Sequence, residues 1–361
     1  SDLSGRFTAQ AAAMYRNLLE ELSAQGGRPD DIVSEKVFLS DIEAQARDLL
    51  RAREGSMAES TIDSGAGPAL SLVEQPPARE GQLCEVQVYA LVSLGTTPVV
   101  SRNLDRLPPG CSGRSVEAGG VRQLFLAGVT GGGSGIHPAF SDQADGMFLN
   151  AEKVLSGEGL SFRDVTRTWL YLKEIDADYT DLNLSRRRFY AARDVRPAPA
   201  STGIRGAVHP KDRLCGLDLR AIAHDGSVDV RPIHAPTMNE APAYGADFSR
   251  GTRVTFPDRV VLYISGTASI DTAGRVVSAG VIEGQVDRML VNVAALLEGQ
   301  GATWRDLVSA ITYLKDPRDM EVFRRVCKRH GLSERAPNTI CVADVCRPEW
   351  LCEMEAIAVI A

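Results

Sequence analysis

The feature that most constrains the fold of this chain is a segment of fourteen residues that occurs three times. It reads GGRPDDIVSEKVFL at 26–39, GLSFRDVTRTWLYL at 159–172 and GATWRDLVSAITYL at 301–314. An aspartate is in register in all three copies, and an aromatic residue precedes the final leucine each time. Self-similarity at fixed landmarks indicates repeated supersecondary units that pack against one another.

The same elements surround each copy of this segment. Before it, apolar residues recur at helical spacing, as in Met14, Leu18 and Leu22. After it, the pattern predicts a strand, a second amphipathic helix and two closing strands, the last of which begins with Leu-Cys at 83–84, 214–215 and 351–352. The sequence therefore predicts one α+β unit that occurs three times.

The repeats divide the chain into three units. We expect unit one at 1–95, without an opening strand, then a linker at 96–115. Unit two is expected at 116–228 and unit three at 229–361, which begins with a proline-rich connector at 229–257. Proline-rich and glycine-rich segments of this length usually run over the surface and often shape binding sites.

Composition excludes several classes of partner. The 361 residues carry a net charge of −7 without a compensating basic run, which argues against nucleic acid. No apolar run is long enough to cross a membrane. The seven cysteines and five histidines show no metal-binding spacing, so we expect no metal or cofactor, and reduced thiols in the cytoplasm.

Glu353 is the residue in which we expect chemistry. It heads the last predicted strand beside the apolar residues Leu351, Cys352 and Met354. Burial of this kind raises the pKa of a carboxyl group and suits it to donate a proton near pH 7. The competing interpretation is an ordinary solvent-facing glutamate of a strand. Glu85 occupies the same position in unit one, where we expect a structural role, and Gly216 in unit two has no acid to offer.

The order of elements, the Tyr-Leu-Lys strand ends and the terminal run Glu-Met-Glu-Ala-Ile-Ala resemble the RidA/YjgF family of small trimeric proteins. The resemblance implies mixed sheets packed around an axis with helices outside, here as an intramolecular pseudo-trimer that is a monomer or a homodimer. In that family a Pro-Ala-Arg-Ser motif lies fifteen residues before the glutamate, and its arginine clamps a 2-imino acid. The corresponding residues here are Leu70, Ser201 and Asn338, so the arginine is absent three times.

A larger relative resembles the chain in more places. The runs that carry this second resemblance are 166–169, 199–204, 244–245 with Arg250, 264–268 and 323–327, and they are similar to the chorismatases. Those are two-unit RidA-like enzymes that hydrolyse the enol ether of chorismate and release pyruvate, with a catalytic glutamate that matches Glu353. Unit one is then an additional copy. The residues that this resemblance and the need to hold an anion single out for substrate binding are Arg167, Asn183, Tyr244, Arg250, Thr267, Asn338 and Arg347.

The sequence thus predicts a chorismatase-like hydrolase or lyase with Glu353 as general acid. Its substrate would be a small anionic enol ether, enamine or imine in a biosynthetic pathway of secondary metabolism. Two alternatives stay open, a non-catalytic protein that binds a small molecule or scaffolds a pathway, and a RidA-type imine deaminase. The run 186–188 of three arginines is expected on a solvated helix face with at most one residue turned inward.

Overall fold

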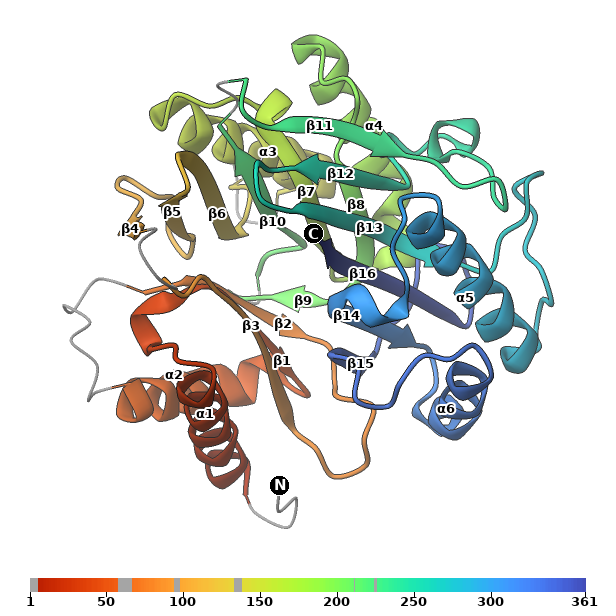
Figure 1. The fold of residues 1–361 in the computed structure, drawn as a ribbon, viewed down its shortest axis with the longest axis horizontal. Helices are drawn as coiled ribbons and strands as arrows, with labels where there is room; N and C mark the ends of the chain where they lie inside the picture. The colour runs from red at the N-terminus through yellow and green to blue at the C-terminus, as the bar shows by residue number, and fades with distance from the viewer. Residues whose placement is uncertain (1–5, 58–66, 94–97, 133–137, 211, 224–225) are drawn as a thin grey trace.

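In the part of the chain that the structure describes, the three predicted units form three mixed β-sheets with six α-helices (Figure 1). The computed structural model describes residues 6–57, 67–93, 98–132, 138–210, 212–223 and 226–361. In unit one, α1 (Phe7–Ala24) and α2 (Ile42–Met57) cover strands β1 (Ile32–Leu39), β2 (Ala69–Glu74) and β3 (Cys84–Ala90). The strand order of this sheet is β3-β1-β2-β9, and β9 (Ala207–Val208) comes from unit two.

Units two and three have six-stranded sheets of the same order, β4-β5-β6-β10-β7-β8 and β11-β12-β13-β16-β14-β15. The elements of unit two are β4 (Val99–Asn103), β5 (Ser112–Ala118), β6 (Val121–Val129), α3 (Phe140–Gly157), β7 (Val165–Leu172), α4 (Ile175–Arg193), β8 (Ala200–Arg205) and β10 (Cys215–Ile222). Those of unit three are β11 (Asp229–Ile233), β12 (Gly251–Thr255), β13 (Val260–Ala268), α5 (Ile282–Glu298), β14 (Leu307–Leu314), α6 (Met320–Arg329), β15 (Asn338–Val342) and β16 (Cys352–Ile360). One pair of strands in each unit is parallel, and the other pairs within units two and three are antiparallel.

The repeated aspartate has a local structural role. Asp31, Asp164 and Asp306 each end a single 3-10 turn that leads into β1, β7 and β14. Each carboxylate accepts a hydrogen bond of 2.7 Å from the backbone N–H three residues earlier. These bonds satisfy a donor at the start of the turn, so the aspartates set the entry of the central strand in every unit.

The segments expected to be connectors contain strands. Residues 96–115 were predicted to be a linker, but they include β4 and the start of β5, which pair with each other and extend the sheet of unit two. The connector at 229–257 likewise contains β11, β12 and the 3-10 turn Ala241–Tyr244. Both pairs lie toward the outer edge of a sheet, and the buried positions of β5 and β12 include glycine, serine, arginine and threonine, so the apolar pattern of these strands is weak. In the described part of unit one, α1 precedes every strand, as predicted.

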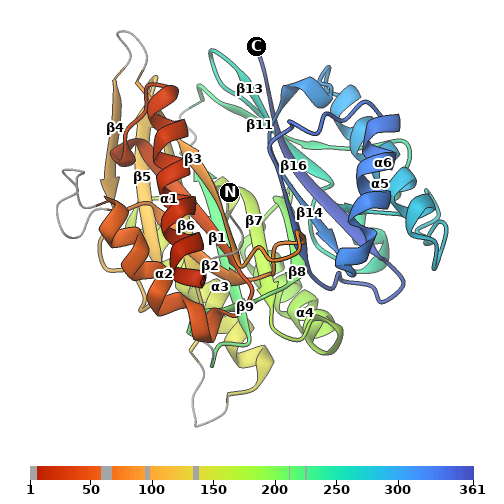
Figure 2. The ribbon, with the colours of Figure 1, turned by 90° about the horizontal axis from the view of Figure 1, so that it is seen from below.

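The inner faces of the three sheets pack against one another, and the helices lie outside (Figure 2). Every pair of units is joined by main-chain or hydroxyl hydrogen bonds. Between units one and two, the Leu70 N–H donates to Ser112 Oγ at 2.7 Å. Between units two and three, the Ser201 N–H donates to Ser265 Oγ at 2.9 Å. Between units one and three, the Ala78 N–H donates to the Ile340 carbonyl at 2.8 Å. The chain is therefore a closed, intramolecular pseudo-trimer.

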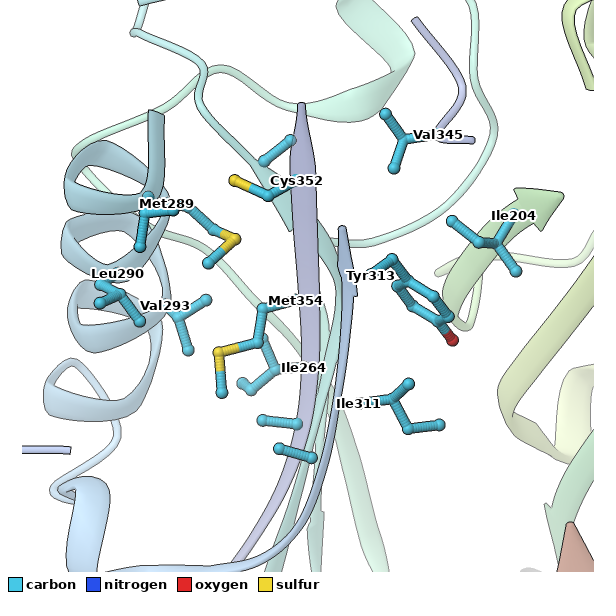
Figure 3. Close-up of a cluster of buried hydrophobic side chains, with 14 of the residues drawn as sticks. Ile204, Ile264, Met289, Leu290, Val293, Ile311, Tyr313, Val345, Cys352 and Met354 are labelled. Carbon is cyan, nitrogen blue, oxygen red and sulfur yellow. The ribbon is translucent and has the colours of Figure 1, made fainter. Parts of the chain in front are cut away.

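The two faces of β16 are buried in different environments (Figure 3). Cys352 and Met354 point toward α5, where Met289 and Val293 pack against them. Tyr313 of the neighbouring strand points the opposite way, toward β8 of unit two. Because side chains alternate along a strand, Glu353 and Glu355 share the face that is turned to unit two.

No helix in the described ranges is both long and apolar enough to cross a lipid bilayer.

We expect the protein to be a monomer or a dimer in solution, not a trimer. All three inter-unit contacts are made within one chain, so no equivalent surface is left for two further copies. Light scattering coupled to size exclusion measures this directly, and a mass of three chains would contradict it.

Candidate active site

Glu353 lies at the contact between units two and three. Its side chain is 3% exposed, and its backbone pairs with Ala268 of β13 and Tyr313 of β14. The carboxyl group packs directly on the backbone of Gly266, since a Cβ there would lie 2.1 Å from Oε1 of Glu353. Gly266 in turn donates its N–H to Thr202 Oγ1 of unit two at 3.0 Å. A glycine at 266 is therefore required for the carboxyl group to occupy this position.

The surroundings of Glu353 favour its protonated form. Burial, followed by the negative charge of Glu355, raises its pKa from 4.5 to about 8, although Arg250 and Arg167 act in the opposite direction. A carboxyl group with this pKa keeps its proton at neutral pH and can donate it to a bound substrate.

Glu355, two residues along the same strand, is held in the opposite state. Its Oε2 accepts a hydrogen bond of 2.9 Å from Arg167 Nη2, and its Oε1 accepts one from Trp169 Nε1. Burial alone would raise the pKa of Glu355, but Arg167, Lys36 and these hydrogen bonds together lower it below its ordinary value. One strand therefore presents a neutral acid and an ionised carboxylate to the same interface, an arrangement typical of acid–base sites.

Two of the predicted anion-binding arginines lie close enough to Glu353 to influence its charge. Arg167 is 1% exposed, bonds to Glu355 and Thr202 through Nη2, and its Nη1 has no hydrogen-bond partner among the described residues. Arg250 is also buried and donates from Nε to the Asn239 carbonyl at 2.8 Å. Buried guanidinium groups beside a neutral acid provide positive charge for an anionic substrate.

Arg186 is a further cation of this site, which the sequence pattern did not single out. It is the inward residue of the run 186–188, with an exposed fraction of 1%. Its Nη2 bonds to Oδ1 of Asn183, and its Nη1 lies 3.4 Å from Ser201 Oγ. Asn183, a predicted binding residue, thus orients Arg186. The spacing Leu182, Arg186, Phe189 on one helix face is the signal that could have identified it.

The structure does not bring Asn338 together with Glu353. Its Oδ1 accepts a hydrogen bond from Thr312 at 3.1 Å, and it lines a surface cavity of about 600 Å³ beside α6. The reason is that β15 faces unit one, where Thr339 bonds to Glu85. The strand that approaches Glu353 is β8 of unit two, so Ser201 and Thr202 occupy the place expected for Asn338.

The remaining predicted binding residues are Thr267, Arg347 and Tyr244, all of unit three. Thr267 is buried and donates to the Ser265 carbonyl at 2.8 Å, which makes it part of the β13 backbone network. Arg347 donates to the Gly274 carbonyl at 3.0 Å and stacks on Trp350. The backbone of Tyr244 ends a 3-10 turn, while its side chain lies outside the described part of the structure.

The two positions equivalent to Glu353 have diverged. At Gly216 a Cβ would lie 2.8 Å from Cγ1 of Val208, so β9 fills the space that a glutamate would need. Glu85 is hydrogen-bonded to Gln82 and Thr339, and burial raises its pKa. Among the described residues no arginine contributes to the shift at Glu85, whereas two act on Glu353.

All seven cysteines are free thiols, and the described residues contain no group of three or more histidine, cysteine, aspartate or glutamate side chains that could hold a metal ion.

The raised pKa of Glu353 predicts a specific effect of Glu353→Gln on stability. Below pH 4.5 the glutamate is protonated in both the folded and the unfolded chain, and between pH 4.5 and about 8 only the folded chain keeps the proton. The wild type therefore loses stability across this range, and the variant does not. Urea denaturation at pH 5, 6.5 and 8 should show the variant gaining stability relative to wild type as pH rises. A constant difference would contradict the burial of this acid.

Glu355→Gln should behave in the opposite way. It leaves Arg167 buried without its carboxylate, which typically costs about 3–5 kcal/mol. Because the pKa of Glu355 is lowered, its contribution is present above the unfolded pKa and is lost as pH falls. The same denaturation series should therefore show the largest loss at neutral pH and a smaller one in acid.

A family model described as endoribonuclease L-PSP matches residues 238–360. A RutC family protein of Saccharolobus solfataricus is 31% identical over 103 residues, which cover 28% of this chain and 78% of that protein. A RutC family protein of Pyrococcus abyssi is 33% identical over 98 residues, covering 27% of this chain and 76% of that protein.

A crystal structure of chorismatase matches nearly the whole chain. The TM-score is 0.65 at 19% sequence identity, and the match covers 91% of this chain and 93% of the chorismatase. The part left out is far smaller than residues 1–95, so unit one is not an addition to the chorismatase fold, as the sequence had suggested, but largely belongs to it. By the family model and the two RutC family relatives the chain belongs to the RidA superfamily, and the match to chorismatase shows a chorismatase-like fold.

Proposed function

We propose that this protein hydrolyses the enol ether of a small dianionic metabolite of the chorismate type, with Glu353 as proton donor. The observation that carries the proposal is that two carboxyl groups on β16 differ in protonation state at neutral pH. Glu353 is neutral and Glu355 is ionised. The chorismatase match supports the fold, and the name of that protein suggests the substrate. Seven free thiols suit a biosynthetic role in the reducing cytoplasm.

The chemistry follows from the state of the two carboxyl groups. Glu353 transfers its proton to the terminal CH₂ carbon of the enol ether, whose double-bond electron pair forms the new C–H bond. Positive charge then develops on the adjacent carbon and the ether oxygen, and the ionised Glu355 stabilises it electrostatically. Water adds to that carbon and returns a proton to the Glu353 carboxylate. In the resulting hemiketal the bond between this carbon and the ether oxygen breaks, and the hydroxyl proton passes to that oxygen. Pyruvate and the alcohol are released.

Three buried arginines supply the positive charge that such a substrate needs. The chain as a whole carries a net charge of −7, so local cations have to overcome its repulsion of a dianion. Arg167 Nη1 and Arg186 Nε are buried without hydrogen-bond partners in the described residues. Arg250, from unit three, approaches Glu353 closely enough to oppose the rise of its pKa. Positive charge from both units is thus directed toward the position of the substrate carboxylates.

A RidA-type imine deaminase is the second candidate, because one contact favours it. Ser201 occupies the position of the family's clamping arginine, and Arg186 reaches this position from α4. A single guanidinium there suits the one carboxylate of a 2-imino acid. The presence of two further arginines, Arg167 and Arg250, favours the dianionic enol ether instead.

The decisive experiment is to incubate the pure protein with chorismate and to follow pyruvate release. Glu353→Gln should lower kcat by about 10²–10⁴-fold, the usual contribution of general acid catalysis. The matched control is Glu85→Gln, which changes the equivalent glutamate of unit one and should leave kcat unchanged.

Other outcomes would contradict the proposal in distinct ways. Turnover that is indifferent to Glu353→Gln would remove this residue from the mechanism. Tight binding of chorismate without pyruvate release would identify a binding protein. Rapid hydrolysis of 2-iminobutyrate, lost in Arg186→Gln and exceeding the activity on chorismate, would identify a deaminase.

A further inference from the structure

A second cavity lies where the inner faces of the three sheets meet. It has a volume of about 300 Å³, and side chains from all three units line it, among them Lys36, Trp169, Arg220 and Glu355. Glu353 is not among the lining residues, whereas Glu355 is, so this central cavity adjoins the candidate active site through Glu355 but does not contain its proton donor. Val308, a lining residue that is 45% exposed, indicates where the cavity reaches the surface.

The two acidic side chains that face the central cavity are already satisfied. Asp218 accepts hydrogen bonds of 2.9 Å from Tyr171 Oη and from the Gly128 N–H. Glu355 is held by Arg167 and Trp169. A third lining residue, Glu35, directs its carboxylate toward the helices, where Tyr15 and Arg53 bond to it.

In contrast to these carboxylates, the two basic side chains of the cavity make no hydrogen bonds within the described part of the chain. Lys36 Nζ lies 3.9 Å from Asp218 Oδ2, beyond hydrogen-bond distance, and 4.2 Å from the centre of the Trp169 ring. The guanidinium of Arg220 lies 4.5 Å from the ring of Tyr89 and 5.2 Å from that of Phe125. Neither cation donates a hydrogen bond to an acceptor in the described part of the chain.

The balance of charge in the cavity is therefore positive. Arg167, which does not line the cavity, neutralises the charge of Glu355. Asp218 is then the remaining negative charge beside the two cations Lys36 and Arg220. Cations that are enclosed by protein without an acceptor are costly unless a ligand or water satisfies them. The rest of the wall is largely apolar, with Trp169 and Phe125 among its rings, and such walls with a few convergent polar groups are typical of small-molecule sites.

We propose that the central cavity binds a small aromatic carboxylate. Its carboxylate oxygens would accept hydrogen bonds from Lys36 and Arg220, and its flat ring would pack against Trp169 and Phe125. The Glu355–Trp169 hydrogen bond connects this site to the strand that carries Glu353. The proposal goes beyond the hydrolase reaction and does not depend on turnover.

Titration calorimetry of the full chain with benzoate tests the proposal. Benzoate should bind, whereas benzamide, which has the same shape without the charge, and inorganic phosphate, which has charge without the ring, should bind at least tenfold more weakly. Arg220→Gln and Lys36→Met should each weaken benzoate binding about 10-fold to 100-fold, the effect of losing a hydrogen bond to a charged group. Arg220→Lys keeps the charge and should retain part of the affinity.

The control variant is Arg250→Gln, which alters the Glu353 site and should leave benzoate binding unchanged. A crystal soaked with 4-bromobenzoate should place the bromine signal beside Trp169. Loss of binding in Arg250→Gln but not in Arg220→Gln, or a bromine signal at Glu353, would overturn the proposal. Equal binding of benzamide or phosphate, or no binding of benzoate to folded wild type at 10-fold molar excess and millimolar concentration, would overturn it as well.

Discussion

The ion pair between Arg167 and Glu355 is the interaction on which the arrangement of the site depends. It joins β7 of unit two to β16 of unit three, and both side chains are almost completely buried. Burying two charges is costly, so the pair contributes little net stability, yet removing either partner leaves an uncompensated charge. The pair therefore fixes how the two units face each other. It also contributes to the electrostatic environment of Glu353, because burial and then the negative charge of Glu355 raise the pKa of Glu353, while Arg167 acts against the rise.

Sequence repetition predicted the central strands and their helices because each strand is buried on one or both faces. Its register also singled out Glu353 as a candidate acid, whereas Arg167 was proposed from the resemblance to the chorismatases. Asn338 was proposed for substrate binding together with Glu353, but it lies on β15 beside α6, because register within one unit does not say which unit supplies the opposite strand. The outer strands β4, β5, β11 and β12 escaped prediction, since glycine and polar residues occupy many of their positions and leave a weak apolar pattern. Arg186 was overlooked among three adjacent arginines, although its helical spacing distinguishes it.

The three positions equivalent to Glu353 show how the units have specialised. Glu353 has two arginines that act on its charge, Glu85 has only hydroxyl and amide partners, and Gly216 has lost the side chain. A pseudo-trimer in one chain allows each contact to change independently, which a ring of identical subunits does not. The same asymmetry fills the central cavity with different residues from each unit, Lys36 from one, Arg220 from another and Glu355 from the third.

The short strand β9 makes units one and two structurally dependent on each other. It belongs to unit two but pairs with β2 at the edge of the sheet of unit one, and its Val208 occupies the space beside Gly216. One two-residue segment thus joins two units and closes a redundant site. A free copy of unit one would expose the edge of β2, and a free copy of unit two would carry a strand without a sheet. Because of this mutual dependence, neither unit contains all the strands and contacts that complete its own sheet.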